Sequence, residues 1–287
     1  MSDTITVARV RQYNSNVIVL SQQKGSRLRG KTRFENIQAE QYFFERLAKT
    51  AAVPKTVRHG DTPLVNSLHT RRRVVMVDFE WADLIDRQDK IRMLIEPSSE
   101  YAMNAAWALG RAMDDEILTQ MIGSAYTGVD GTTTSSFPSG QKVAVASSGL
   151  TLAKLLSAKE ILDTNDVDPD EPRYIYCRPK DITTLLNTTE VKSADYNTVR
   201  TLVNGEVNTF VGFMFTVGNR AQTATDASSK AVMAWLRDAM GFVVGMDINS
   251  RMDVLPGKSY ATQVYCAATF GSTRVEDEKI VEISVTA

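Results

Sequence analysis

The sequence contains few cysteines and histidines, and neither type forms a cluster typical of a metal site. Cys177 and Cys266 stand far apart in apolar runs, without a CxxC pair, so we expect buried free thiols. The two histidines, His59 and His69, lie in a polar stretch away from both cysteines, and no GxSxG elbow surrounds a serine. Zinc binding and histidine-dependent catalysis are therefore without support, and we predict no cofactor.

Long apolar runs and phosphate-binding loops are also missing. No uninterrupted apolar run approaches the roughly 18 residues needed to cross a bilayer, and the start does not resemble a secretory signal. We therefore expect no membrane association and synthesis in the cytoplasm of the producing cell. Neither GxGxxG nor GxxxxGK[ST] occurs, which removes the common cradles for nucleotide phosphates.

Net charge is low but unevenly distributed. The whole chain carries a formal charge of -1, whereas residues 1–33 hold seven basic residues and one acidic residue, a sum of +6. The remaining residues therefore sum to -7. The basic start is interpreted as an arm that is solvated or bound to a partner, with contact to nucleic acid as the alternative.

Hydrophobic periodicity predicts a mixed α+β protein. Helices are expected at 36–49, 98–122, 150–163 and 179–187, and strands at 70–81, 174–177, 210–217, 232–236, 241–246, 260–270 and 279–285. The clearest pattern is the long helix 98–122, whose apolar residues recur every three or four positions and which Gly123 ends. Residues 123–149 are rich in Ser, Thr and Gly and predict a loop or a loose hairpin.

Two acidic stretches could suggest metal chemistry. Asp114, Asp115 and Glu116 are consecutive on a helix, so their side chains fan out by about 100 degrees each and cannot converge on one ion; we interpret them as a solvated or partner-facing patch. The loop from Asp163 to Asp170 lacks the glycine and terminal glutamate of a calcium-binding EF-hand. A metal-dependent hydrolase or nuclease built on that loop remains the alternative from another class.

The arginine triplet Arg71, Arg72 and Arg73 stands at the head of the strand 70–81. Adjacent residues of a strand project to opposite faces, so at least one guanidinium needs water or an anionic partner. One interpretation is a solvated edge that deters strand pairing. The other is contact with an adjacent subunit, for which Asp114, Asp115 and Glu116 are candidate acceptors. The same ribbon carries Phe79 and Trp81, which need a cover from the chain's own core or from a neighbour.

The stretch TRRRVVMVDFEWADLIDRQDKIRMLIEPSSEYAMNAAWALGRAMDDEIL, residues 70–118, resembles major capsid proteins of tailed bacteriophages with the HK97-type fold. A weaker resemblance covers 150–246 and resumes in KSYATQVYCAATFGSTRVEDEKIVEI near the end of the chain. It implies an N-terminal arm (1–49), an extended E-loop ribbon with a transition segment (50–97), a peripheral domain with a long spine helix (98–149 and 247–287) and an axial domain (150–246).

The resemblance implies a structural function without catalysis. Subunits would form pentamers and hexamers of an icosahedral shell that encloses double-stranded DNA in the virion. An encapsulin-like compartment shell is the alternative with the same fold. The short segment before the ribbon leads us to expect a separate scaffolding protein or none, and portal and decoration proteins are further possible partners.

Overall fold

The computed structural model describes residues 22–86, 98–188, 209–220, 222–226 and 228–286. In these residues the chain has α+β architecture, with three helices and three sheets. The helices are α2 (Ser98–Ile122), α3 (Leu152–Thr164) and α4 (Pro179–Asn187). None of them is long and apolar enough to span a bilayer. The long predicted helix thus begins and ends where its apolar period and Gly123 placed it.

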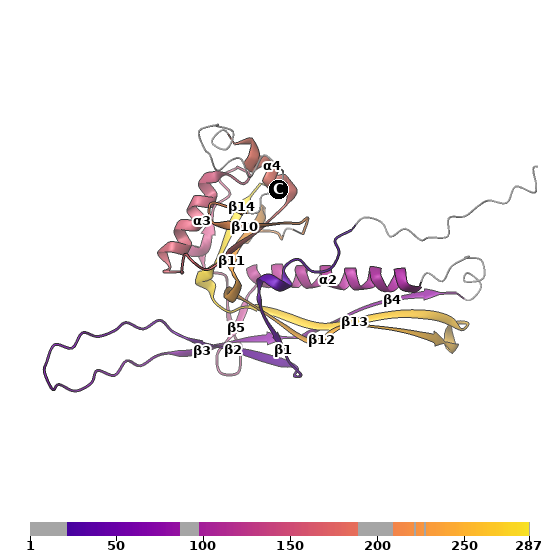
Figure 1. Cartoon of the computed structure of the whole chain (residues 1–287), viewed down its shortest axis with the longest axis horizontal. Helices are drawn as coiled ribbons and strands as arrows, with labels where there is room; N and C mark the ends of the chain where they lie inside the picture. The colour runs from indigo at the N-terminus through magenta and orange to yellow at the C-terminus, as the bar shows by residue number, and fades with distance from the viewer. Residues whose placement is uncertain (1–21, 87–97, 189–208, 221, 227, 287) are drawn as a thin grey trace, which may run out of the picture.

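The first sheet lies along α2 (Figure 1). Its strand order is β1 (Arg33–Asn36), β12 (Met240–Leu255), β13 (Ala261–Arg274) and β4 (Val77–Ile85). Leu109, Met113 and Ile117 of α2 are buried in the core between helix and sheet. Phe79 of β4 stacks on Phe270 of β13 with ring centroids 4.3 Å apart. One apolar face of α2 therefore anchors the helix to the sheet.

The second sheet has six strands and forms a separate part of the molecule, with α3 and α4 packed against it (Figure 1). Its order is β7 (Lys142–Val143), β14 (Ile280–Val285), β11 (Lys230–Leu236), β8 (Arg173–Cys177), β10 (Phe213–Val217) and β9 (Thr209–Phe210). β10 and β8 run parallel, while β11 is antiparallel to both of its neighbours. Cys177 and Cys266 are buried free thiols, as predicted.

The third sheet is ordered β2 (Gln41–Leu47), β3 (His69–Val75), β5 (Ala125–Thr127) and β6 (Thr133–Ser135). β5 and β6 form the hairpin considered for residues 123–149. The predicted strand 70–81 is two strands in different sheets, because the chain leaves the third sheet after β3 and enters the first sheet at β4. Short 3-10 turns occur at Arg29–Lys31, Ser139–Gln141, Arg237–Ala239, Pro256–Lys258 and Asp277–Lys279.

The helix predicted at 36–49 was wrong, since this segment contains the end of β1 and the whole of β2. The apolar residues fit a helical period, but Tyr42 and Phe44 also alternate as in a strand, and aromatic residues favour strands. Phe44 is buried beside Val74 and lies against Gly241, where a Cβ would stand 2.2 Å from its ring. β2 pairs with β3 over its full length, and this pairing outweighs the helical pattern of residues 36–49.

Residues 48–68 connect β2 to β3 as a long extended loop that reaches away from the rest of the subunit (Figure 1). Nearly all of these residues are exposed. We call this segment the E-loop. Its base is held by Ala48, whose N–H donates to the carbonyl of Leu68 at 2.9 Å, and by the Lys49 ammonium, which lies 3.0 Å from the Glu278 carboxylate.

Candidate inter-subunit surfaces

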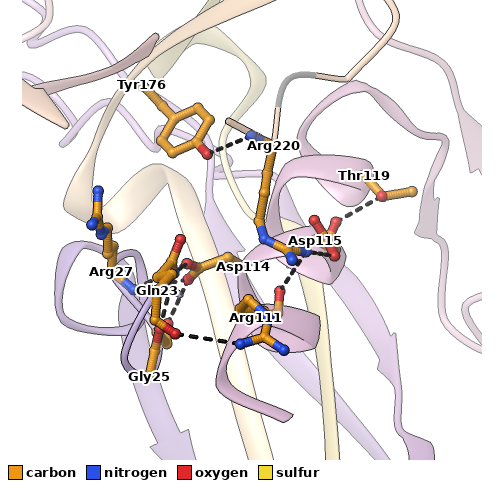
Figure 2. A network of polar contacts seen from close by, with 10 residues as sticks. Gln23, Gly25, Arg27, Arg111, Asp114, Asp115, Thr119, Tyr176 and Arg220 are labelled. Carbon is orange, nitrogen blue, oxygen red and sulfur yellow. Dashed lines mark hydrogen bonds and ion pairs between the residues drawn. The ribbon is translucent and has the colours of Figure 1, made fainter. Parts of the chain in front are cut away.

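Asp114 is buried in α2 and holds an N-terminal segment of its own subunit (Figure 2). Its carboxylate accepts hydrogen bonds from the side chains of Gln23 at 2.5 Å and Ser26 at 2.6 Å. It also accepts from the backbone N–H groups of Arg27 and Leu28, both at 3.1 Å. Four donors on one carboxylate replace the water that burial removed, so Asp114 fixes the path of this segment over the helix.

Gly25 and Gly110 let the segment lie directly on the helix backbone. A Cβ at Gly110 would stand 2.6 Å from the Cα of Gly25 and 2.8 Å from the backbone nitrogen of Ser26. Gly25 has a φ of +72°, a conformation that other residues adopt at a cost. Gln22 adds contacts to the neighbouring turns of α2, because it donates to Asn104 at 2.7 Å and accepts from the Arg111 guanidinium.

Asp115, the next residue, faces the six-stranded sheet (Figure 2). Its carboxylate forms an ion pair with Arg220, which follows β10, and its side chain remains about half exposed. The backbone N–H of Arg220 donates to the Tyr176 hydroxyl at 3.0 Å. Burial raises the pKa of Tyr176 to about 12, so this phenol stays protonated under ordinary conditions.

Glu116 has a third environment. It is partly buried, and Gln120 of the next turn donates to its carboxylate at 3.1 Å. Burial raises the pKa of Glu116, while the hydrogen bond from Gln120 opposes that change. The three consecutive acids thus point to three different surroundings, as the rotation of 100 degrees per residue requires.

Arg72 is enclosed within the subunit and does not reach the surface. Its guanidinium lies 2.6 Å from Asp277, which also accepts from Arg274 at 2.7 Å. Burial lowers the pKa of Arg72, although the carboxylate of Asp277 works in the opposite direction. Arg72 and Asp114 would therefore have to give up contacts inside the subunit before they could meet between subunits.

Arg71 and Arg73 are partly exposed and point to the opposite face of the strand from Arg72. Arg71 pairs with Glu45 at 3.0 Å, and Arg73 lies over the ring of Tyr126 at 4.9 Å from its centroid. The Arg71–Glu45 ion pair is at the surface, where such pairs contribute about 0–1 kcal/mol, and an exposed cation–π contact such as that of Arg73 contributes about 0.5–1 kcal/mol. Of the triplet, Arg71 and Arg73 are thus the two whose side chains keep exposed surface.

Phe79 and Trp81 are partly buried and pack on the core between α2 and the first sheet. Their cover therefore comes largely from the chain's own core, one of the two possibilities that the sequence left open.

The exposed apolar residues of the E-loop are the functional feature that sequence reasoning missed. Leu64 is 89% exposed and Val57 63% exposed, although both are large apolar residues. Val53, Val65 and Leu68 of the E-loop are exposed in the same way, as is Leu47 at the end of β2. The available signal was the presence of apolar residues at irregular spacing in a stretch that otherwise looked like a polar loop.

The acidic loop from Asp163 to Asp170 lines an open cleft of about 870 Å³ at the base of the E-loop. Asp163 pairs with Arg173 at 2.6 Å, and Asp168 accepts from the backbone of Asp170 at 2.9 Å. Within the described ranges, no three His, Cys, Asp or Glu side chains are arranged to hold a metal ion. No observation here favours metal-dependent hydrolysis.

Comparison with known protein families gives a match over nearly the whole chain. Residues 5–287 match the family model described as phage capsid protein. The chain belongs to the phage capsid protein family. This capsid protein is thus a structural protein of the virion, as the resemblance of residues 70–118 implied. No curated protein matches its sequence.

Solved structures confirm the fold of a phage capsid subunit. The capsid of the cyanophage P-SCSP1u has 15% identity and a TM-score of 0.77, with 100% of this chain and 95% of that chain covered. The capsid of Ralstonia phage GP4 has 10% identity and a TM-score of 0.74, over 98% and 96% of the chains. The capsid of cyanophage Pam1 has 12% identity and a TM-score of 0.71, over 100% and 99%.

Proposed function

We propose that the capsid protein assembles with copies of itself into pentamers and hexamers of an icosahedral shell that encloses double-stranded DNA. The observation that carries the proposal is the E-loop, an extended segment whose apolar side chains the subunit leaves in water. Exposed apolar groups concentrated on one projecting segment mark a surface that a partner covers. Because the chain belongs to the phage capsid protein family, we propose that this partner is a second copy of the same chain.

The energetics favour burial of the E-loop against another subunit. Covering a fully exposed Leu or Val side chain stabilises a complex by about 1.5–3 kcal/mol. The E-loop also carries Lys49, Lys55 and Arg58 against the single acidic Asp61, so its charge complements the acidic remainder of the chain. A loop that leaves one side of a subunit for a different surface of the next makes a heterologous contact, and such contacts form rings when the rotation between neighbours closes.

The division of the chain follows the resemblance. We propose an N-terminal arm at 1–49, the E-loop and transition segment at 50–97, a peripheral domain at 98–149 and 247–287, and an axial domain at 150–246. β7 and β14 lie outside 150–246 but pair within the six-stranded sheet. We therefore add these two strands to the axial unit and assign residues 240–246 to the peripheral domain, because β12 pairs in the first sheet. Most of the transition segment, residues 87–97, is outside the described residues.

The charge distribution supports enclosure of DNA without tight binding. Residues 34–287 sum to -7, and every contact between a cationic side chain and a phosphate would add salt-dependent affinity that containment does not need. We propose that packaged DNA lies close to the shell without specific contacts. Scaffolding, portal and decoration proteins would be separate chains. An encapsulin-like shell with protein cargo is the alternative of the same fold.

Electron microscopy of the overexpressed protein tests this function. We expect closed particles from the unaltered chain and mainly unassembled subunits from Leu64→Asp combined with Val57→Asp, because a charge would then be buried at the contact. Thr62→Asp combined with Asn66→Asp adds the same two charges to the same loop at exposed polar positions, without removing an apolar group, and its particles should resemble those of the unaltered chain. A chain that stays monomeric at high concentration, or a double variant that assembles normally, would contradict the proposal.

A further inference from the structure

Residues 23–31 connect the two main parts of the subunit, and we call them the strap. On one side the strap is held by Asp114 of α2. On the other side the Arg27 guanidinium donates to the carbonyl of Val217, and the Lys31 ammonium donates to the hydroxyl of Thr216, both in β10. The indole N–H of Trp235 in β11 donates to the carbonyl of Lys31 at 2.9 Å. The strap therefore bridges the spine helix and the six-stranded sheet.

The other contacts between these two parts are largely apolar. Tyr176, Met233 and Trp235 of the six-stranded sheet share one buried cluster with Met113 and Met121 of α2. Hydrophobic burial is non-directional, so such a cluster holds two elements together without defining the angle between them. Hydrogen bonds weaken steeply when their geometry is distorted, so the polar contacts around the cluster define that angle.

Most of these polar contacts fall on two consecutive residues of α2, and Arg111 one turn earlier adds a carbonyl that accepts from Arg220 at 3.4 Å. Asp114 seats the strap through four hydrogen bonds, and Asp115 is joined to the six-stranded sheet through its ion pair with Arg220, in the segment that follows β10 (Figure 2). The Asp115 pair is half exposed and therefore weak. Asp114 is buried and its partners are fixed, so it provides the more rigid of the two connections.

We propose that Asp114 is a positioning residue that sets the angle between α2 and the six-stranded sheet, and thereby the curvature of the shell. The inference rests on the proposed shell function, because curvature arises from how the axial domains of neighbouring subunits meet. A seated strap holds the sheet at one angle to the helix. A loosened strap leaves the apolar cluster intact but allows a range of angles.

Distance measurements between two spin labels test the angle directly. Met103→Cys on α2 and Leu156→Cys on α3 place one label on each side of the junction, at positions that are about half exposed. The native thiols do not compete for the label, because Cys177 and Cys266 are buried and burial raises the pKa of Cys177 to about 12. Unassembled labelled subunits should give one narrow distance distribution.

Two variants loosen the strap by different routes. Asp114→Asn keeps the shape of the side chain but loses acceptor capacity, and Gln23→Ala combined with Ser26→Ala removes two donors without altering α2. We expect both to broaden or shift the distance distribution. The control Asp130→Asn removes the same charge at an exposed position and should leave the distribution unchanged. If the double variant keeps the narrow distribution of the unaltered subunit, the proposed role of Asp114 is wrong.

Particle diameters extend the test to the shell. We expect both strap variants to form particles of mixed diameter, while Asp130→Asn forms the uniform particles of the unaltered chain. Failure of the unaltered chain to form particles would contradict the shell function, whereas uniform particles from both strap variants would contradict only the inference on Asp114. A purely stabilising role would lower the unfolding temperature without changing particle diameter.

Discussion

At the scale of single residues, ionisable side chains in this protein differ by their surroundings more than by their type. Asp114 and Glu116 are two residues apart on one helix, yet Asp114 is saturated with hydrogen bonds and Glu116 has one side-chain donor. A sequence shows that both are acidic and that they point in different directions. It does not show which acid meets the strap, because those contacts join residues 86 to 91 positions apart.

Glu116 makes stability depend on pH. Burial raises its pKa in the folded protein above the unfolded value near 4.5, so the folded state holds the proton more tightly. The penalty for its charge is absent below the unfolded pKa, grows as pH rises to the folded pKa and is complete above it. We therefore expect Glu116→Gln to increase the unfolding free energy more at pH 8 than at pH 4, as urea titration of unassembled subunits would measure.

The exposed residue Glu160 gives the matched control, since Glu160→Gln should change stability by no more than about 0.5 kcal/mol at either pH. A Glu116→Gln effect that is the same at both pH values would show that the carboxylate is not penalised by burial.

At the scale of elements, hydrophobic periodicity correctly predicted the secondary structure of segments whose own sequence shows which face is buried. The helix at 98–122 shows one continuous apolar period, and α4 was predicted from 179 to 187 because Pro179 opens it. The segment 36–49 failed because its pattern fits both periods, and the choice is made by pairing with β3. The break at Met76 was not predictable, since β3 and β4 are both strands and differ only in the sheet that they join.

Gly271 marks the place where these two sheets meet. A Cβ at this position of β13 would lie 2.4 Å from the backbone oxygen of Val75, the last residue of β3, and backbone cannot move aside as a side chain can. We expect Gly271→Ala to lower the unfolding free energy by about 1–3 kcal/mol, as urea titration would measure.

Gly140 is the control for this prediction, because a Cβ there meets nothing within 4 Å. Gly140→Ala should stay within about 0.5 kcal/mol of the unaltered chain. Equal stability of the two alanine variants would mean that the junction of the sheets adapts at little cost.

At the scale of the whole molecule, the described residues form two large cores, a small one around Phe44 and Val74, and one large projection without a core. The projection is the E-loop, and its base carries the exposed pair of Arg71 and Glu45. Sequence comparison identified the family, and hydrophobic periodicity predicted the helices and most of the strands. The resemblance implied an extended ribbon here, but which of its apolar side chains are exposed could not be predicted, because solvent exposure depends on which elements lie nearby and not on residue type alone.

Charge reversal at Arg71 and Arg73 tests the remaining inter-subunit prediction. If these arginines bind Asp115, Glu116 or other carboxylates of a neighbour, Arg71→Glu with Arg73→Glu should reduce particle yield most strongly at low salt and less at high salt, where charges are screened. Lys159→Glu with Lys180→Glu reverses two charges elsewhere and is the control. Yield and salt dependence equal to those of the unaltered chain would contradict the prediction, which light scattering during assembly would measure.

The strap also has a consequence for the order of events during synthesis. Residues 23–31 leave the ribosome early, but the carbonyl of Val217 that receives Arg27 lies 190 positions later, and β1 pairs with β12 beyond that. Contacts of such long sequence separation form late in folding. The strap's contacts with β10 and β11, and the pairing of β1 with β12, therefore form only after most of the chain has been made. The strap therefore joins α2 to the six-stranded sheet only near the end of translation. The angle between this helix and this sheet is fixed only after the sheet has formed.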